Sequence, residues 1–407
     1  MHRGDRLNKQ AKQAILIACC LVFVFFSYVY LTYFQSDVLT MTQHVMSGGR
    51  TTYRVILFSS IITLLLAILP FALTKYLKFP IRFLAVAWFP SFLILGWLTD
   101  VGLSEVNPES HGIGILPFVI AIILFGLASY MLPKFAENTI HKSSLVSSLW
   151  PNLLVFVVCM AFTTYVGNTN RTIHFELRLE RLISQEKYDE VIELTSKEDY
   201  PSRCVMSIRA YALSKQNRLA DNLFFYPNRV GGETLLPPPT DSLRPANIPA
   251  VLKDYLGGYP IHDMSATHFF QYLAADTVYN ECVKDYLLCA FLLDKNLDNF
   301  VDSLIVYYGP KDEPQSETDK SKKNVKKKTK EVDPVKFSNL PRHYAEALLL
   351  YSRLHENPKA LLEDDETLEN FEGFQSTYKK ESDPKLREQL CRTYYNETYW
   401  VFYHFTK

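Results

Sequence analysis

The stretch "AILIACCLVFVFFSYVYLTYF", residues 14–34, contains no charged side chain over 21 residues. About 20 predominantly apolar residues in an α-helix are enough to cross the hydrocarbon core of a bilayer. Four further segments have this length and character: 55–74, 81–98, 113–132 and 146–166. The first segment is too long for a secretory signal peptide and has no small-residue cleavage pattern after it. We therefore predict an all-α protein that starts with a five-helix transmembrane domain, residues 1–166.

The rest of the chain has the composition of a water-soluble domain. Of the 43 basic and 43 acidic residues, 32 and 37 fall in residues 167–407. The balanced total indicates no class of partner, and no feature suggests nucleic-acid binding, a cofactor or a metal. Membrane lipids are the one partner that the five apolar segments imply directly.

Basic residues in the connectors predict the orientation. Residues 1–13, 75–82 and 133–145 carry nine Lys and Arg, whereas the two connectors on the opposite side carry only Arg50 and Arg54. The positive-inside rule then puts the N-terminus in the cytoplasm and residues 167–407 on the outer side. No Asp, Glu, Lys or His lies in the middle of a span, which argues against an ion-coupled transporter or pump. Pro90 lies near the centre of the third span and is expected to kink it.

Apolar residues spaced by three and four predict helices in residues 167–310. Short polar turns separate them at "QEKY" (185–188), "KQN" (215–217) and "DKN" (294–296). The stretches "KYDEVIEL" (187–194), "NRLADNLF" (217–224) and "NLDNFVDSL" (296–304) resemble the start of the second helix of a tetratricopeptide repeat. Tyr188 takes the place of the family's aromatic residue, and Asp189 and Glu190 that of its acidic pair; Val191 departs from the usual alanine. The resemblance implies a TPR-like stack of hairpins with a concave protein-binding surface, and an ordinary helical bundle is the alternative.

Two segments beyond the hairpins have a different character. Residues 311–336 form a Lys-rich linker with seven lysines in 320–330, and they are expected to be disordered. The linker either contacts anionic headgroups or an acidic partner, or is a plain solvated loop. Residues 337–407 are predicted to form a C-terminal helical region, with a strong helix after Pro341 in "SNLPRHYAEALLLYSRLHENP" (338–358). Its aromatic tail, "TYYNETYWVFYHFTK" (393–407), either caps the helices, docks on the membrane or binds a partner.

Four cysteines lie in the predicted outer domain, where disulfides are allowed. Cys282 and Cys289 are seven residues apart on a predicted helix, which separates their Cα atoms by about 10 Å. A disulfide needs less than about 7 Å. Any bridge must therefore involve Cys204 or Cys391, and free thiols are the alternative.

The connector "DVLTMTQHVMSGGRTTYR" (37–54) holds the candidate site residues. Gly48 and Gly49 are expected to end a short helix, and Arg50 and Arg54 to contact lipid headgroups or phosphate. The connector also resembles the first outer loop of GT-C glycosyltransferases, which carries an acidic residue. That resemblance implies an alternative in which Asp37, with His44, is catalytic in a transferase acting on a lipid-linked substrate. Those enzymes have more spans and more loop carboxylates than this chain.

Three stretches together, "QHVMSGGRTTYR" (43–54), "LPRHYAEALLLYSRL" (340–354) and the aromatic tail, resemble uncharacterised Bacteroidetes membrane proteins with a domain of unknown function. The resemblance implies a bacterial inner membrane with the soluble domain in the periplasm. It also makes Ser242 in "DSL" (241–243) a candidate for O-glycosylation. We expect a non-enzymatic protein that holds or assembles another envelope protein through its helical domain.

Overall fold

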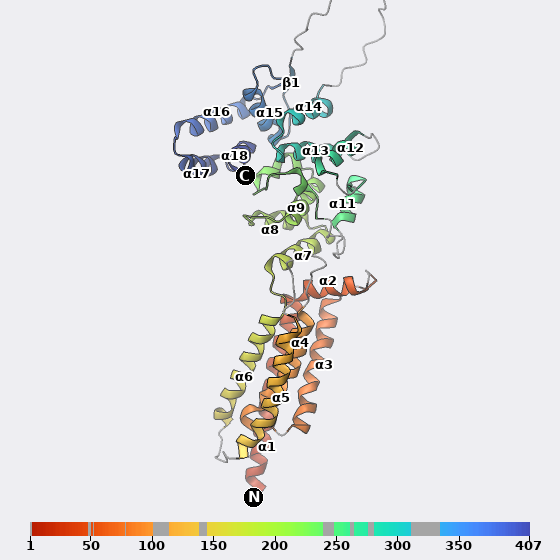
Figure 1. Ribbon diagram of the computed structural model, residues 1–407, viewed down its shortest axis with the longest axis vertical. Helices are drawn as coiled ribbons and strands as arrows, with labels where there is room; N and C mark the ends of the chain where they lie inside the picture. The colour runs from red at the N-terminus through yellow and green to blue at the C-terminus, as the bar shows by residue number, and fades with distance from the viewer. Residues whose placement is uncertain are drawn as a thin grey trace, which may run out of the picture. The chain divides into compact units, whose positions relative to one another are not determined.

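The computed structural model describes residues 2–47, 50–51, 53–77, 79–100, 114–137, 145–238, 248–260, 264–275, 281–310 and 334–407. These residues form two compact units, one up to Arg178 and the other from Leu179 onward. We call them the N-terminal unit and the C-terminal unit. The boundary falls inside helix α7 (Arg171–Ser184). Almost all regular structure in both units is helical (Figure 1).

The N-terminal unit contains the five predicted apolar helices, each long and apolar enough to cross a membrane. This confirms the five segments that the sequence predicted. The helices run roughly side by side in Figure 1, and an aromatic cluster around Phe23, Trp88, Phe92 and Phe156 lies between them. The elements are α1 (His2–Val29) with the π-turn η1 (Tyr30–Phe34), α3 (Val55–Tyr76), η2 (Ile81–Trp88) with α4 (Phe89–Thr99), α5 (Ile115–Glu137) and α6 (Leu145–Val166).

The third apolar segment is broken into a 3-10 helix and an α-helix. Phe83 has non-helical dihedral angles (φ −127°, ψ 27°), and Pro90 lies in the first turn of α4. The sequence predicted a kink at Pro90; in the structure, a new helix begins there instead. Asn152 of α6 satisfies backbone groups of the irregular part: its Oδ1 accepts from Ala85 N at 2.7 Å and its Nδ2 donates to Ile81 O at 2.9 Å. An unpaired backbone group would be costly in a bilayer.

The connector after the first span contains the expected short helix, α2 (Ser36–Ser47). Its Val38 and Met41 are buried against Ile173 and Leu177 of α7. The predicted turn at Gly48 and Gly49 lies outside the described residues.

Helical hairpins build the first part of the C-terminal unit, and further helices complete it. Sequence periodicity predicted three of these hairpins: α7 with α8 (Tyr188–Ser196), α9 (Arg203–Lys215) with α10 (Leu219–Asn222), and α13 (Cys282–Leu293) with α14 (Leu297–Tyr308). The other elements are η3 (Leu223–Phe225), η4 (Gly232–Leu235), α11 (Ile248–Leu256), α12 (Ala266–Ala275), α15 (Arg342–Leu354), α16 (Asp365–Lys380), α17 (Pro384–Tyr395) and α18 (Tyr399–Phe405).

The three hairpins share one turn geometry. Glu186, Asn217 and Lys295 have φ values of 57°, 54° and 56°, and they occupy the same position in their turns. The next backbone N–H in each turn donates to the carbonyl five residues earlier: Lys187 to Leu182 (3.0 Å), Arg218 to Leu213 (2.9 Å), and Asn296 to Phe291 (2.9 Å). This six-to-one hydrogen bond belongs to the Schellman motif that ends many helices.

The sequence did not predict the small sheet of the C-terminal unit. Strands β1 (Val335–Phe337) and β2 (Ala360–Leu362) pair in parallel, with Val335 opposite Ala360. Strands of three residues are too short to show alternation, so no pattern could reveal them. All seven cysteines are free thiols, including Cys204 and Cys391.

Candidate functional site

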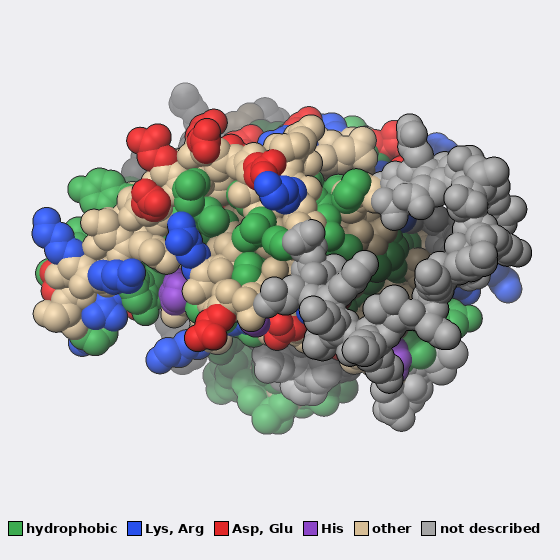
Figure 2. Space-filling view, turned by 90° about the horizontal axis from the view of Figure 1, so that it is seen from above, with side chains coloured by type: hydrophobic (Ala, Val, Ile, Leu, Met, Phe, Trp, Pro, Cys, Tyr) green, Lys and Arg blue, Asp and Glu red, His purple; other side chains and the backbone are tan. Residues whose placement is uncertain are grey.

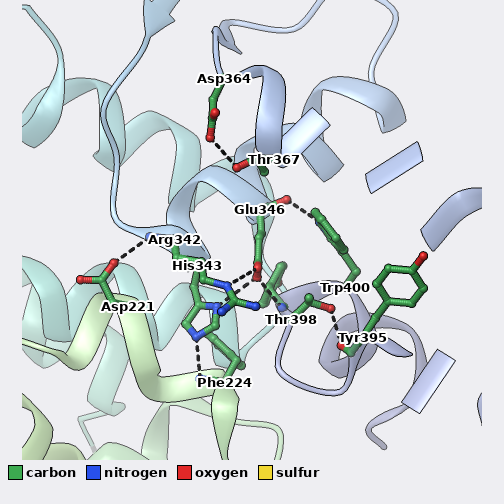
Figure 3. Close-up of polar contacts among 11 residues, drawn as sticks. Asp221, Phe224, Arg342, His343, Glu346, Asp364, Thr367, Tyr395, Thr398 and Trp400 are labelled. Atoms are coloured by element: carbon green, nitrogen blue, oxygen red, sulfur yellow. Dashed lines mark hydrogen bonds and ion pairs between the residues drawn. The ribbon is translucent and has the colours of Figure 1, made fainter. Parts of the chain in front are cut away.

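A buried carboxylate organises the polar centre of the C-terminal unit. Glu346 lies one turn after Arg342 and His343 on α15, so the three side chains share one side of the helix. Its Oε1 accepts from Arg342 Nε at 3.0 Å, and its Oε2 accepts from His343 Nδ1 at 3.0 Å and from Tyr399 N at 2.7 Å (Figure 3). Glu346 is only 3% exposed, so its charge depends on these three donors for stabilisation.

The position of His343 fixes its tautomer. Its Nε2 lies 3.2 Å from the backbone N of Phe224, and a backbone N–H can only donate. Nε2 therefore carries no proton, and Nδ1 carries the proton that is donated to Glu346. The imidazole is fully buried between the rings of Phe224 and Phe225, both in edge-to-face contact. His343 is thus a fixed structural donor.

The same network holds the aromatic tail in place. Trp400 Nε1 donates to Glu346 O at 2.8 Å, and the Tyr399 hydroxyl donates to Leu292 O at 3.2 Å. Both side chains are buried, with exposures of 1% and 0%. Lys295, the turn residue of the third hairpin, donates from Nζ to Thr406 O at 2.6 Å. Of the three sequence-based alternatives, the structure therefore favours the tail as a cap on the helices.

A pocket of about 800 Å³ opens beside this network, and we call it the acidic pocket. Asp221, which accepts from Arg342 N at 2.8 Å, and Asp364, which caps α16, form part of its wall. Glu366 and Glu397 also line it; both are exposed, and neither has a basic partner within ion-pair distance among the described residues. Arg342 is the basic residue in the lining, and it is paired with Glu346. The pocket therefore favours a cationic ligand.

The face drawn in Figure 2 does not share this bias. Acidic and basic side chains are interspersed over the face drawn in Figure 2, with hydrophobic side chains between them. Charge selectivity would therefore arise in the acidic pocket itself and not from a field over the whole face.

The candidate site residues from the sequence, Asp37, His44, Arg50 and Arg54, do not all line one pocket. Asp37, in the first turn of α2, lines a second pocket of about 920 Å³ that belongs wholly to the N-terminal unit. His44 lies in the last turn of α2, and the exposed Arg50 and Arg54 follow that helix; none of the three lines this pocket. From α7, the basic residues Arg171, His174 and Arg178 line this pocket together with Asp37.

Other predicted features fall outside the described residues. Ser242 lies within 239–247, and lysines 320–330 lie within 311–333. In the part of the chain that the structure describes, no group of His, Cys, Asp or Glu could hold a metal ion.

Sequence reasoning missed the network around Glu346. The stretch "RHYAEALLLYSRL" was interpreted only as a strong helix. A signal was present, because His343 and Glu346 are polar residues in an otherwise apolar run of helix. Their partners Phe224 and Tyr399 lie 119 and 53 residues away in sequence, which no local pattern reveals.

Fold and pockets together define an all-α protein in which five helices of membrane-spanning length precede a unit built on helical hairpins. Comparison with protein families adds the family: residues 5–256 and 260–406 match the Family of unknown function (DUF6057), and the chain belongs to it. No curated protein and no solved structure matches the chain.

Proposed function

We propose that this protein is a membrane-anchored scaffold whose C-terminal unit binds a partner protein. The observation that carries the proposal is the set of three helical hairpins with one turn geometry at Glu186, Asn217 and Lys295. Stacked hairpins of this kind present extended surfaces on which side chains bind other proteins. The TPR-like resemblance of the second helices, at Tyr188, Asp189 and Glu190 for example, supports the same function.

The proposed location follows from the connectors. Their Lys and Arg bias favours a cytoplasmic N-terminus and a C-terminal unit on the outer side. With the resemblance to Bacteroidetes membrane proteins, this favours a bacterial inner membrane and a periplasmic C-terminal unit. The partner would then be an envelope protein, with membrane lipids surrounding the spans.

The acidic pocket gives the partner a chemical character. Glu366 and Glu397 are exposed carboxylates without a basic partner among the described residues. A partner segment that carries Lys or Arg would form ion pairs with them. The wall behind them is fixed, because Glu346 ties α15 to Tyr399 and Trp400. A fixed wall reduces the entropy lost on binding.

Peptide binding to the detergent-solubilised full chain tests this function. The probe is a fluorescent Lys-rich peptide of about 12 residues, with its Lys→Glu counterpart as the sign control, followed by anisotropy. We expect the double variant Glu366→Lys, Glu397→Lys to weaken binding of the basic peptide by about tenfold, because like charges are brought together. The matched control is Glu369→Lys, Glu372→Lys, on the same helix α16 but outside the pocket.

The control should bind as the wild type does. Equal loss in both double variants would mean that overall charge, not the acidic pocket, drives binding. Equal affinity for the basic and acidic peptides would remove the basis for a cationic partner.

A second candidate function is a transferase acting on a lipid-linked substrate. The placement of Asp37 in a pocket with Arg171 and Arg178 favours it, although His44 does not line that pocket. The variant Asp37→Asn separates the two candidates. A transferase would lose product formation in membranes while keeping its partner, and a scaffold would keep both its partner and its cellular effect.

A further inference from the structure

The 920 Å³ pocket of the N-terminal unit has two chemically distinct ends. Val22, Phe25 and Val29 of α1 and Met160 of α6 line the apolar end. These residues belong to helices with the length and composition of membrane spans. Phe25 is 73% exposed, so the apolar end is open to its surroundings. In a bilayer, hydrocarbon would fill this end.

Side chains of Arg and His gather at the other end. Arg171, His174 and Arg178 have the i, i+3, i+7 spacing that places residues on one face of a helix. Burial of Ile173 and Leu177 against α2 fixes the rotation of α7. Both arginines are exposed, and neither has a carboxylate within ion-pair distance among the described residues. His174 Nε2 lies 2.9 Å from Asn168 O, so the ring is held in place.

A buried acceptor completes the polar end. Gln35 is 3% exposed and lines the pocket; its Nε2 donates to Asn168 O at 3.1 Å. Its Oε1 is buried and has no hydrogen-bond partner among the described residues. A buried acceptor without a donor costs free energy that a ligand could recover by donating to it. Asp37, in the same lining, adds a carboxylate and disfavours a multiply anionic ligand.

We infer that this pocket binds a membrane phospholipid whose headgroup carries a hydrogen-bond donor beside its phosphate. The hydrocarbon chain lies along Val22, Phe25 and Val29, and Arg171 and Arg178 hold the phosphate. The headgroup's ammonium or hydroxyl donates to Gln35 Oε1. A soluble anion would leave the apolar end unfilled, and an uncharged lipid would leave both guanidinium groups without a counter-charge. The inference is independent of partner binding by the C-terminal unit.

Native mass spectrometry of the detergent-solubilised full chain tests the assignment. The probes are phosphatidylethanolamine and phosphatidylglycerol, which carry a phosphate and a donor; phosphatidylcholine, which lacks the donor; and diacylglycerol, which lacks the phosphate. A polyprenyl phosphate represents lipid-linked substrates. We expect the first two to bind most tightly, phosphatidylcholine more weakly, and diacylglycerol least.

Two double variants of basic residues show where the phospholipid binds. We expect Arg171→Ala with Arg178→Ala to weaken phosphatidylethanolamine binding by about tenfold or more, because charged hydrogen bonds are lost. The matched control is Lys75→Ala with Arg82→Ala, which also removes two exposed basic side chains of this unit but lies outside the pocket; it should bind as the wild type does. A third variant, Val29→Trp, keeps the arginines and fills the apolar end, and it should also weaken binding.

Several results would overturn the inference. The assignment fails if the Arg171, Arg178 variant binds within threefold of the wild type, or if the Lys75, Arg82 control loses as much. It fails equally if diacylglycerol binds as tightly as phosphatidylethanolamine. Tighter binding of the polyprenyl phosphate than of either donor-bearing phospholipid would overturn the choice of ligand.

Discussion

Glu346 is the residue on which the packing of the C-terminal tail depends most directly. Its two oxygens accept three hydrogen bonds, and two of the donors, His343 Nδ1 and Tyr399 N, share Oε2. In Glu346→Gln, an amide NH2 group replaces one carboxylate oxygen. This NH2 group is a donor and would face one of the present donors. We expect this variant to lower the free energy of unfolding by about 2–4 kcal/mol. Denaturant unfolding of the full chain measures the loss.

The exposed Glu372→Gln on α16 is the matched control and should change stability by less than about 0.5 kcal/mol. If Glu346→Gln unfolds at the same denaturant concentration as this control, the buried network does not hold the tail.

Asp285 gives the C-terminal unit a predictable response to pH. Burial raises the pKa of its carboxyl above the ordinary value, although the Tyr308 and Tyr344 hydroxyls that donate to its Oδ1 lower it. The pKa of Asp285 is therefore higher in the folded chain than in the unfolded chain. Its contribution to the free energy of unfolding is fully present below about pH 4, and it is lost as pH rises through the folded pKa. Asp285→Asn retains an oxygen for both hydroxyls and removes the charge.

We therefore expect Asp285→Asn to raise the melting temperature of the full chain at pH 7 and to leave it nearly unchanged at pH 4. The exposed Asp254→Asn on α11 is the control and should show no such difference. A variant that is less stable than the wild type at pH 7 would contradict the argument.

At the scale of elements, the turn between α7 and α8 has a strained backbone at Glu186. Glu186 is exposed and adopts a left-handed conformation (φ 57°) that an L-residue with a Cβ disfavours. Glu186→Gly relieves this strain, and we expect a gain of about 0.5–1 kcal/mol in unfolding free energy. Gln185→Gly, one residue earlier, should instead lose stability. Denaturant midpoints of the two variants check the opposite signs, and a loss in both would show that the turn is not strained.

Sequence patterns predicted most elements because apolar periodicity is a local property. The second span, predicted at 55–74, is α3 at Val55–Tyr76, and the turns at "QEKY", "KQN" and "DKN" are the observed hairpin turns. The 3-10 start of the third span was not predicted, because it depends on Asn152, some 70 residues away. The network around Glu346 and the α7 residues that share a pocket with Asp37 were not predicted, for the same reason. Asp37 comes to share a pocket with Arg171 and Arg178 only after the spans have folded.

At the scale of the whole molecule, the prediction concerns sidedness. The thiols of Cys282, Cys289 and Cys391 have pKa values raised by burial, so a maleimide should react with them slowly. A cysteine introduced at the exposed Glu372 should be labelled by a membrane-impermeant maleimide in intact spheroplasts. A cysteine at Lys134, in the last turn of α5, should be labelled only after permeabilisation. The reverse pattern would place the C-terminal unit in the cytoplasm.

The measurement that tests the scaffold function most directly is site-specific photocrosslinking of the full chain in native membranes. The crosslinker is placed at Asn370, which lines the acidic pocket, and in a control at Glu372, on the same helix outside it. We predict one discrete protein adduct at Asn370 that disappears in Glu366→Lys, Glu397→Lys and is absent at Glu372. No protein adduct at Asn370, or the same adducts at both positions, would contradict partner binding through this pocket.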